Sequence, residues 1–294
     1  MRFSLPKILT ERAPAKVNLT LHVVGRRADG WHDLESLVAF SRGGDALALT
    51  EGEALALSIE GPVAAAGPVS DNLVLRAARH FADCFPNAKL GAFHLVKRLP
   101  VAAGLGGGSS DAAAALRLLA RANAVAPGDA GVMDAACATG ADVPVCLMRR
   151  ARMMRGVGDE LGPLIALPPL IGLLVNPGEP VETKAVFARM KIAPGSAIGF
   201  GGHPEFSPDM PAETLVAALR KGRNDMESAA CLLAPVIGDV LSVLGAAPGC
   251  RLARMSGSGA TCFALFKDCR SAARAKKAIL RAHPSWWAKS CVLN

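Results

Sequence analysis

A glycine-rich segment constrains the fold of this chain more than any other sequence feature. Residues 104–111 read Gly-Leu-Gly-Gly-Gly-Ser-Ser-Asp, and an alanine-rich stretch that favours a helix follows from Ala112 to Ala122. The segment has neither the Gly-Lys-Ser/Thr of a P-loop nor the G-x-G-x-x-G spacing of a dinucleotide fold. Glycines permit positive φ and close approach to an anion, and the free amides of a first helical turn attract negative charge. The segment therefore predicts a phosphate-binding loop; the alternative is a flexible turn in which Ser109 or Ser110 caps the helix.

Composition narrows the class of protein. The chain has 294 residues, of which 51% are hydrophobic, so it can bury a sizeable core and is neither disordered nor a disulfide mini-protein. The longest uncharged run, residues 161–178, contains four prolines, and no apolar stretch follows the basic N-terminus. We therefore predict no membrane span and no signal peptide. Because the eight cysteines form no C-x-x-C pair, we expect reduced thiols and a cytoplasmic protein.

The net charge of +8 lies in the last part of the chain. Residues 251–294 hold nine Lys or Arg residues against one acid, Asp268. A basic helix could bind RNA, which gives one alternative function. However, Arg270, Arg274, Lys277 and Arg281 recur at the three- and four-residue spacing of a solvated helix face. We therefore expect no nucleic-acid partner.

The hydrophobic pattern predicts strands and helices in an irregular order, which favours the α+β class. A strand is predicted over 15–23, a hairpin over 47–59 around Glu51-Gly52-Glu53, and a helix over 72–84 with Asp71 as its N-cap. A proline-rich connection, residues 162–169, is the candidate domain boundary. The other predicted elements are strands over 93–96, 170–175 and 261–266 and helices over 212–221, 224–244 and 269–282.

Three separated motifs carry a family resemblance. Pro100 through Ser110 to Ala113 resembles the nucleotide loop of the GHMP small-molecule kinases, and Ala13–Leu19 and Met255–Ala260 resemble that family's first and third motifs. They occur in the family's order across nearly the whole chain. The resemblance implies a two-domain fold: a ribosomal-protein-S5-domain-2-like, ATP-binding N-terminal domain over 1–162 and a ferredoxin-like α+β domain on the substrate side over 163–294.

Two further stretches, Arg26–Leu34 and Gly140–Pro144, resemble one branch of that family. Its members phosphorylate the 2-hydroxyl of a cytidine-diphosphate-linked methylerythritol in the non-mevalonate isoprenoid pathway. The resemblance thus implies ATP as co-substrate and a small-molecule acceptor. Another GHMP kinase, of the homoserine or mevalonate type, is the alternative within the family. Mg²⁺ is expected with ATP, no metal ligand stands out, and the oligomeric state is left open.

The resemblance also implies roles for single residues. Asp142 would face the acceptor hydroxyl, as general base or electrostatic positioner, and Lys16 would contact that hydroxyl and the transferred phosphate. The structural alternatives are a helix cap for Asp142 and a solvated strand residue for Lys16. The expected ATP-binding residues are Lys97, Pro100, Val101, Ala102, Ala103, Gly104, Leu105, Gly106, Gly107, Gly108, Ser109 and Ser110.

The substrate side requires a pocket for cytosine. By resemblance, His32 would bind the edge of the base, and Trp31 and Phe187 would stack on its two faces. Trp31 departs from the family's usual tyrosine, so stacking is expected to survive without the hydroxyl. Asn18 and Thr183 would contact the erythritol or phosphate region. Core packing is the alternative for Trp31 and Phe187, and a surface position is the alternative for Lys97.

Overall fold

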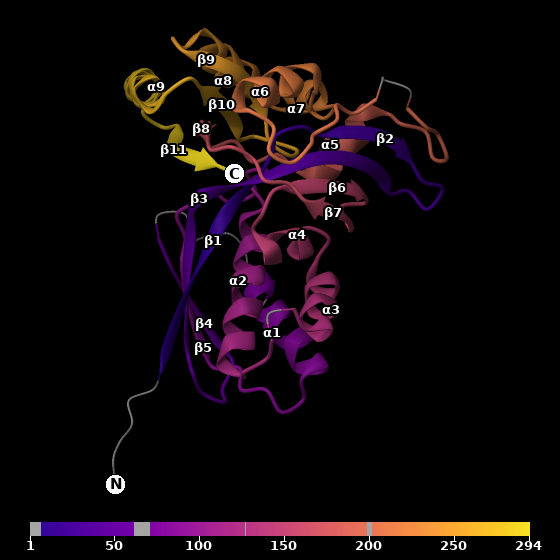
Figure 1. Cartoon of the computed structure of the whole chain (residues 1–294), viewed down its shortest axis with the longest axis vertical. Helices are drawn as coiled ribbons and strands as arrows, with labels where there is room; N and C mark the ends of the chain where they lie inside the picture. Colours follow the sequence, from indigo (N-terminus) through magenta and orange to yellow (C-terminus); the bar gives the residue numbers. More distant parts are fainter. Residues whose placement is uncertain (1–6, 62–70, 127, 199–201) are drawn as a thin grey trace. The chain divides into compact units, whose positions relative to one another are not determined.

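The computed structural model describes residues 7–61, 71–126, 128–198 and 202–294, which fall into two compact units (Figure 1). The strands β1 (Ile8–Asn18) and β3 (His32–Thr50) contribute residues to both units, so the units are interleaved along the chain. Unit 1 comprises the chain up to Ala15, Gly43–Val101 and Gly106–Arg149; unit 2 comprises Lys16–Arg42, Ala102–Leu105 and Arg150–Asn294.

Unit 1 contains a sheet in which β5 (Ala92–Val96) lies between β3 and β4 (Ala56–Glu60). β5 is antiparallel to β3 and parallel to β4. The predicted hairpin over 47–59 is therefore wrong, although both of its strands exist. Phe93 and Leu95 of β5 are buried, and this apolar strand supplies the neighbour that each flanking strand needs.

The described residues of unit 1 also form the helices α1 (Leu73–Cys84), α2 (Gly107–Ala122), α3 (Ala130–Thr139) and α4 (Val143–Met148). α1 packs on α2 and α3, and α4 packs on the same two helices. The alanines at 112–115 are fully buried, because small side chains allow close helix packing. Asn72, not the predicted Asp71, caps α1: its Oδ1 accepts a hydrogen bond of 2.9 Å from the amide of Val74.

Unit 2 is built on an antiparallel sheet in the order β11-β8-β10-β9. The predicted strands over 170–175 and 261–266 are confirmed as β8 and β10. A second group of strands, β2, β6 and β7, joins the first part of β3. The strand bounds are β2 (His22–Arg26), β6 (Arg152–Gly156), β7 (Glu160–Leu164), β8 (Leu170–Asn176), β9 (Cys250–Met255), β10 (Cys262–Phe266) and β11 (Trp287–Leu293).

Helices cover a hydrophobic core in unit 2 to which Leu173, Ile237 and Ile279 belong. The predicted helix over 224–244 is two helices, because Pro235 disfavours helical backbone at Ala234, whose φ is −135° and ψ is 87°. The predicted strand over 15–23 is also interrupted, since Leu21 pairs instead with Asn224. The helix bounds are α5 (Thr183–Met190), α6 (Ala212–Lys221), α7 (Glu227–Leu233), α8 (Val236–Ala246) and α9 (Cys269–Ala282).

Within the described part of the chain, no helix has both the length and the apolar character needed to span a bilayer.

Candidate active site

The glycine-rich segment forms the N-terminus of α2 and gives it the backbone geometry that anion binding requires. The helix begins at Gly107, its N-cap residue Gly106 has the left-handed φ of 58°, and no side chain caps it. The alternative, a cap by Ser109 or Ser110, is therefore wrong. Ser110 is buried, and its Oγ donates a hydrogen bond of 2.5 Å to the carbonyl of Pro14. The backbone amides of the first turn thus face outward from the helix end, where the macrodipole favours an anion.

A buried ion network lies directly beneath this helix start. Lys97 donates hydrogen bonds to Asp45 and, at 2.8 Å, to Asp111 in the first turns of α2. A Cβ on Gly107 would lie 3.6 Å from the Lys97 Nζ. Lys97 is 8% exposed, so the surface alternative for this residue is wrong. Asp45 also accepts hydrogen bonds from the amides of Arg98 (2.5 Å) and Leu99 (2.8 Å), which fixes the chain just before the loop.

The network contains two carboxylates for one ammonium group. Burial raises the pKa of Asp111 to about 7, and the charge of Asp45 adds to this, whereas Lys97 opposes it. Burial alone would lower the pKa of Lys97, but Asp111 and Asp45 together raise it. The Oδ1 of Asp111 is buried and has no hydrogen-bond partner among the described residues. Asp111 is therefore the carboxyl group of the network whose pKa is raised into the neutral range.

Unit 2 contains the other part of the predicted loop, residues 102–105, packed on the third motif. Ser256 Oγ donates to the carbonyl of Gly104 at 2.9 Å, and the amide of Thr261 donates to Ala103 at 3.2 Å. Gly104 has a φ of 70°, and a Cβ there would overlap the carbonyl oxygen of Ser256. The Asn224 side chain donates to the carbonyls of Met255 and Gly257, which holds the motif from its other side. Asn224 was not predicted, because no motif around it in the sequence points to this role.

Lys16 and Asn18 contact the same part of unit 2, which is formed by residues 102–105 and the third motif. The amide of Lys16 donates to Leu105 at 2.9 Å, and Lys16 is only 4% exposed, so the solvated-strand alternative is wrong. Asn18 is also buried: its amide donates to Ser256 Oγ at 3.1 Å and its Nδ2 donates to Ser36 Oγ at 2.8 Å. Ser256 thus joins the first motif, the loop and the third motif in one set of contacts.

The predicted base-binding residues meet elsewhere in unit 2. The rings of His32 and Phe187 stack with centroids 4.1 Å apart and an interplanar angle of 11°. Burial, together with the charge of Arg26, lowers the pKa of His32, and its buried Nε2 has no hydrogen-bond partner among the described residues. Trp31 is 62% exposed, so core packing is wrong for this residue. The neutral imidazole of His32, whose Nε2 has no partner among the described residues, and the exposed indole of Trp31 are therefore adjacent in the chain.

Thr183 and Asp142 occupy helix starts. Thr183 is the first residue of α5, and its Oγ1 lies 2.7 Å from Ser258 Oγ, so it contacts the third motif within unit 2. Asp142 is the N-cap residue of α4 in unit 1, but its side chain makes no capping hydrogen bond. The helix-cap alternative therefore does not account for the Asp142 carboxylate.

Comparison with known proteins decides the family. The N-terminal domain of the GHMP kinases matches residues 72–150 and their C-terminal domain matches residues 212–285. A 4-diphosphocytidyl-2-C-methyl-D-erythritol kinase of Methylobacterium radiotolerans is 57% identical over 282 residues, 95% of this chain and 97% of that protein. The chain belongs to the 4-diphosphocytidyl-2-C-methyl-D-erythritol kinase family. The Xanthobacter autotrophicus member is 55% identical over 292 residues, 98% of this chain and all of that protein.

Solved structures confirm the fold of this GHMP kinase. A crystal structure of 4-(cytidine 5'-diphospho)-2C-methyl-D-erythritol kinase matches with a TM-score of 0.75 and 35% identity, over 97% of this chain and 99% of that one. A homoserine kinase from Cytophaga hutchinsonii matches with a TM-score of 0.66 at 17% identity, which shows the shared fold alone. The predicted α+β kinase fold is thus confirmed. The division at residues 162 and 163 stays a prediction.

The described residues of the kinase offer no ready cage for a metal ion. No group of three or more His, Cys, Asp or Glu side chains gathers in the part of the chain that the structure describes. Asp45 and Asp111 are engaged by Lys97. We therefore assign no metal ligand among the described residues.

Asp111 gives the kinase a specific pH dependence of stability. Below about pH 4 the folded and unfolded states both hold its proton; between about pH 4 and 7 only the folded state does. The free energy of unfolding therefore falls as the pH rises through this window. We expect the free energy of unfolding of the wild type to fall by on the order of 2–4 kcal/mol across this window, and that of Asp111→Asn to show no such fall. Urea unfolding of both proteins at pH 5, 6 and 7 measures the difference. The exposed Asp134→Asn on α3 is the control, and parallel pH profiles for wild type and Asp111→Asn would contradict the assignment.

Proposed function

We propose that this kinase transfers the γ-phosphoryl group of ATP to the 2-hydroxyl of 4-diphosphocytidyl-2-C-methyl-D-erythritol. The observation that carries the proposal is the match, at 57% identity over 95% of the chain, to a kinase named for that substrate. The exposed Trp31 indole and the His32 Nε2, which has no hydrogen-bond partner among the described residues, support a site for a planar base.

On the ATP side, the phosphates bind the amides at the start of α2. The residues that we assign to this role are those of the loop, Pro100 to Ser110, with Lys97 as a buried cation beneath Gly107. Phosphoryl transfer needs alignment and counter-charge more than covalent chemistry, and outward-facing amides on a fixed helix supply both. Mg²⁺ would accompany ATP and would supply positive charge to its phosphates.

On the acceptor side, Asp142 faces the hydroxyl and Lys16 contacts the hydroxyl and the phosphoryl group in transfer. Asp142 is half-buried with a carboxylate that does not cap its helix, and Lys16 is a buried cation. In these roles a carboxylate can orient the hydroxyl and accept its proton, and a cation can stabilise the charge of the transferred phosphoryl group. Asn18 and Thr183 contact the erythritol and phosphate region.

The kinase works, in this proposal, as a cytoplasmic enzyme without a nucleic-acid partner. All eight cysteines are free thiols, as expected in a reducing compartment. The basic residues Arg270, Arg274 and Lys277 lie on the exposed face of α9, while Ala275 and Ile279 face the core. A face of this kind supplies solubility and only weak, salt-sensitive affinity for polyanions.

A direct assay tests the proposed reaction. Purified kinase is incubated with Mg²⁺-ATP and 4-diphosphocytidyl-2-C-methyl-D-erythritol, and release of ADP is followed together with the mass of the product. We expect one phosphate to be added, with homoserine and mevalonate at least 100-fold poorer by kcat/KM because neither carries a base. Binding of Mg²⁺-ATP without phosphorylation of the cytidine substrate would refute the assignment.

The substrate side gives a separate prediction. We expect His32→Ala to raise the KM for the cytidine substrate about 10- to 100-fold. The variant loses the hydrogen bond to the edge of the base and the imidazole ring that packs against Phe187. The KM for ATP should stay within twofold of the wild-type value. His94→Ala, at a half-exposed histidine on β5, is the control and should change neither constant. An unchanged KM for the cytidine substrate would remove His32 from the pocket.

A further inference from the structure

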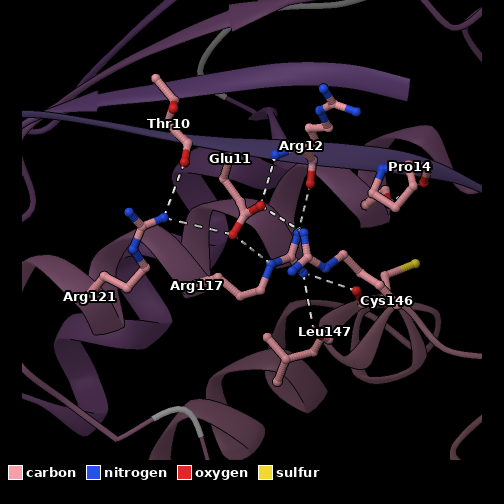
Figure 2. Close-up of polar contacts among 10 residues, drawn as sticks. Thr10, Glu11, Arg12, Pro14, Arg117, Arg121, Cys146 and Leu147 are labelled. Atoms are coloured by element: carbon pink, nitrogen blue, oxygen red, sulfur yellow. Dashed lines mark hydrogen bonds and ion pairs between the residues drawn. The ribbon is translucent and has the colours of Figure 1, made fainter. Parts of the chain in front are cut away.

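One buried arginine in unit 1 connects three elements through their backbones. Arg117 lies on α2, and Figure 2 shows its guanidinium among carbonyl oxygens of β1 and α4. Its Nη1 donates to the carbonyls of Cys146 (3.1 Å) and Leu147 (3.2 Å), and its Nη2 donates to that of Arg12 (2.9 Å). The side chain is 13% exposed. These bonds engage backbone rather than side chains, so they fix positions of whole elements.

The contacts on α4 are at the end of a very short helix. α4 has six residues, from Val143 to Met148, with Asp142 at its N-cap and Arg149 at its C-cap. The last carbonyls of a helix lack partners within the helix, and a cation there is favoured by the helix dipole. Because six residues rise only about 9 Å, a shift at the Arg117 contacts is transmitted directly to Asp142.

The other end of the connection is the phosphate-binding helix. Arg117 is ten residues after Gly107 on α2, or about 15 Å along one uninterrupted helix. The same rigid element therefore presents amides to the phosphates at one end and holds the carbonyls of α4 further along. This arrangement defines the position of Asp142 relative to the loop within unit 1.

Glu11 holds the arginine in place. Its carboxylate lies 3.4 Å from Arg117 Nε and 2.7 Å from Arg149 Nη1, and it accepts the amide of Arg12 at 2.9 Å. Burial would raise the pKa of Glu11, but the Arg12 amide and the two arginines lower it below its ordinary value. Burial lowers the pKa of Arg117 to about 10, so the guanidinium stays charged at neutral pH. The pair is thus ionised on both sides.

We propose that Arg117 is a positioning residue that aligns Asp142 with the phosphate-binding start of α2, and that Glu11 orients its guanidinium. The proposal rests on the proposed function, because it concerns the role of Asp142 in phosphoryl transfer. Misplacement of a reacting group by about 1 Å costs on the order of 100-fold in rate. Arg117 acts through Asp142, because its own contacts are with backbone carbonyls and Glu11.

The test compares Arg117→Lys with Arg121→Ala in steady-state kinetics. Lysine keeps the charge but cannot reach three carbonyls, so we expect kcat to fall about 10- to 100-fold with the KM for ATP within twofold of wild type. Arg121 lies one turn further along α2 and is 50% exposed; it bonds Thr10 rather than α4, and its Nη1 is 4.0 Å from the Glu11 carboxylate. Because Glu11 keeps its closer contacts with Arg117 and Arg149, the Arg121→Ala variant should keep kcat within twofold. An unchanged kcat in Arg117→Lys overturns the proposal.

A double-mutant cycle separates positioning from general destabilisation. If Arg117 acts through Asp142, Arg117→Lys should lower the kcat of Asp142→Ala by less than a further twofold. If Arg117→Lys lowers kcat equally in the wild type and in Asp142→Ala, the proposal is overturned. If Arg117→Lys does not fold, Glu11→Gln takes its place and should lower kcat only when Asp142 is present. Inactive wild-type kinase would refute the proposed function itself. Active wild type with an unaffected Arg117→Lys variant refutes only the positioning role.

Discussion

Asp142→Ala is expected to lower kcat by about 10²- to 10⁴-fold, the usual contribution of a positioned acid–base group, with the KM for ATP within twofold of wild type. The carboxylate is half-buried at the start of α4 and makes no capping bond, so its removal leaves the helix intact. The phosphate-binding amides belong to α2 and are unaffected. The loss should therefore appear in turnover and not in nucleotide binding, which single-turnover kinetics and ATP titration measure separately.

Two further variants sharpen the result. Asp134→Ala removes an exposed carboxylate on the neighbouring helix α3 and should leave kcat unchanged. Asp142→Asn keeps the shape and a hydrogen bond but cannot accept a proton. If Asp142→Asn loses as much kcat as Asp142→Ala does, the carboxylate is a general base. If Asp142→Asn keeps a tenth or more of the wild-type kcat, the carboxylate positions the hydroxyl. Near-normal turnover of Asp142→Ala would exclude this residue from the chemistry.

Gly104→Ala is expected to lower kcat/KM for ATP at least 100-fold and to lower the melting temperature by at least about 4 °C. Gly104 has a φ of 70°, which costs an alanine about 1–2 kcal/mol, and the new Cβ would overlap the carbonyl of Ser256. Backbone must then move, because the obstructing atom is not on a flexible side chain. The hydrogen bond from Ser256 Oγ to Gly104 is lost with it.

The control for this variant is Gly238→Ala on α8, also in unit 2. A Cβ at Gly238 would meet no atom within 4 Å, and an alanine in a helix is favoured over glycine, so stability should be kept or rise. Nucleotide affinity is measured by titration and unfolding by calorimetry for both variants. Wild-type kcat/KM in Gly104→Ala would show that the loop does not depend on this backbone conformation.

The sequence predicted local features well and partners distant in sequence poorly. The helix over 269–282 and the strands over 170–175 and 261–266 follow from periodicity, which acts within one element. The hairpin over 47–59 failed because the partner of both strands, β5, lies more than thirty residues later. Pro235 is a sequence signal for the break between α7 and α8. The apolar periodicity over 224–244 obscured this signal.

The same distinction holds for the site. The loop and its helix are contiguous, so the glycines at 104–108 were enough to predict an outward-facing helix start. Asp45 was missed because it reaches Lys97 across 52 residues, and its only sequence signal is an acid directly before the apolar residues 46–49. Arg117 was missed because its partners are backbone carbonyls, which any residue supplies. Contacts of that kind leave no pattern in the side chains.

The interleaving of the two units sets an order in which the chain can fold as it is synthesised. Unit 1 is complete once Arg149 has left the ribosome, whereas residues 16–42, made much earlier, belong to a unit whose other strands follow Arg150. At about 5–20 residues per second, synthesis of residues 150–294 takes roughly 7–30 s. During that interval β2 can pair with the first part of β3, but β6, which also pairs with that part of β3, has not yet been made. A nascent chain that pauses after residue 149 would therefore carry a finished unit 1 and a β2–β3 hairpin that lacks β6, a substrate for chaperones rather than a shorter enzyme.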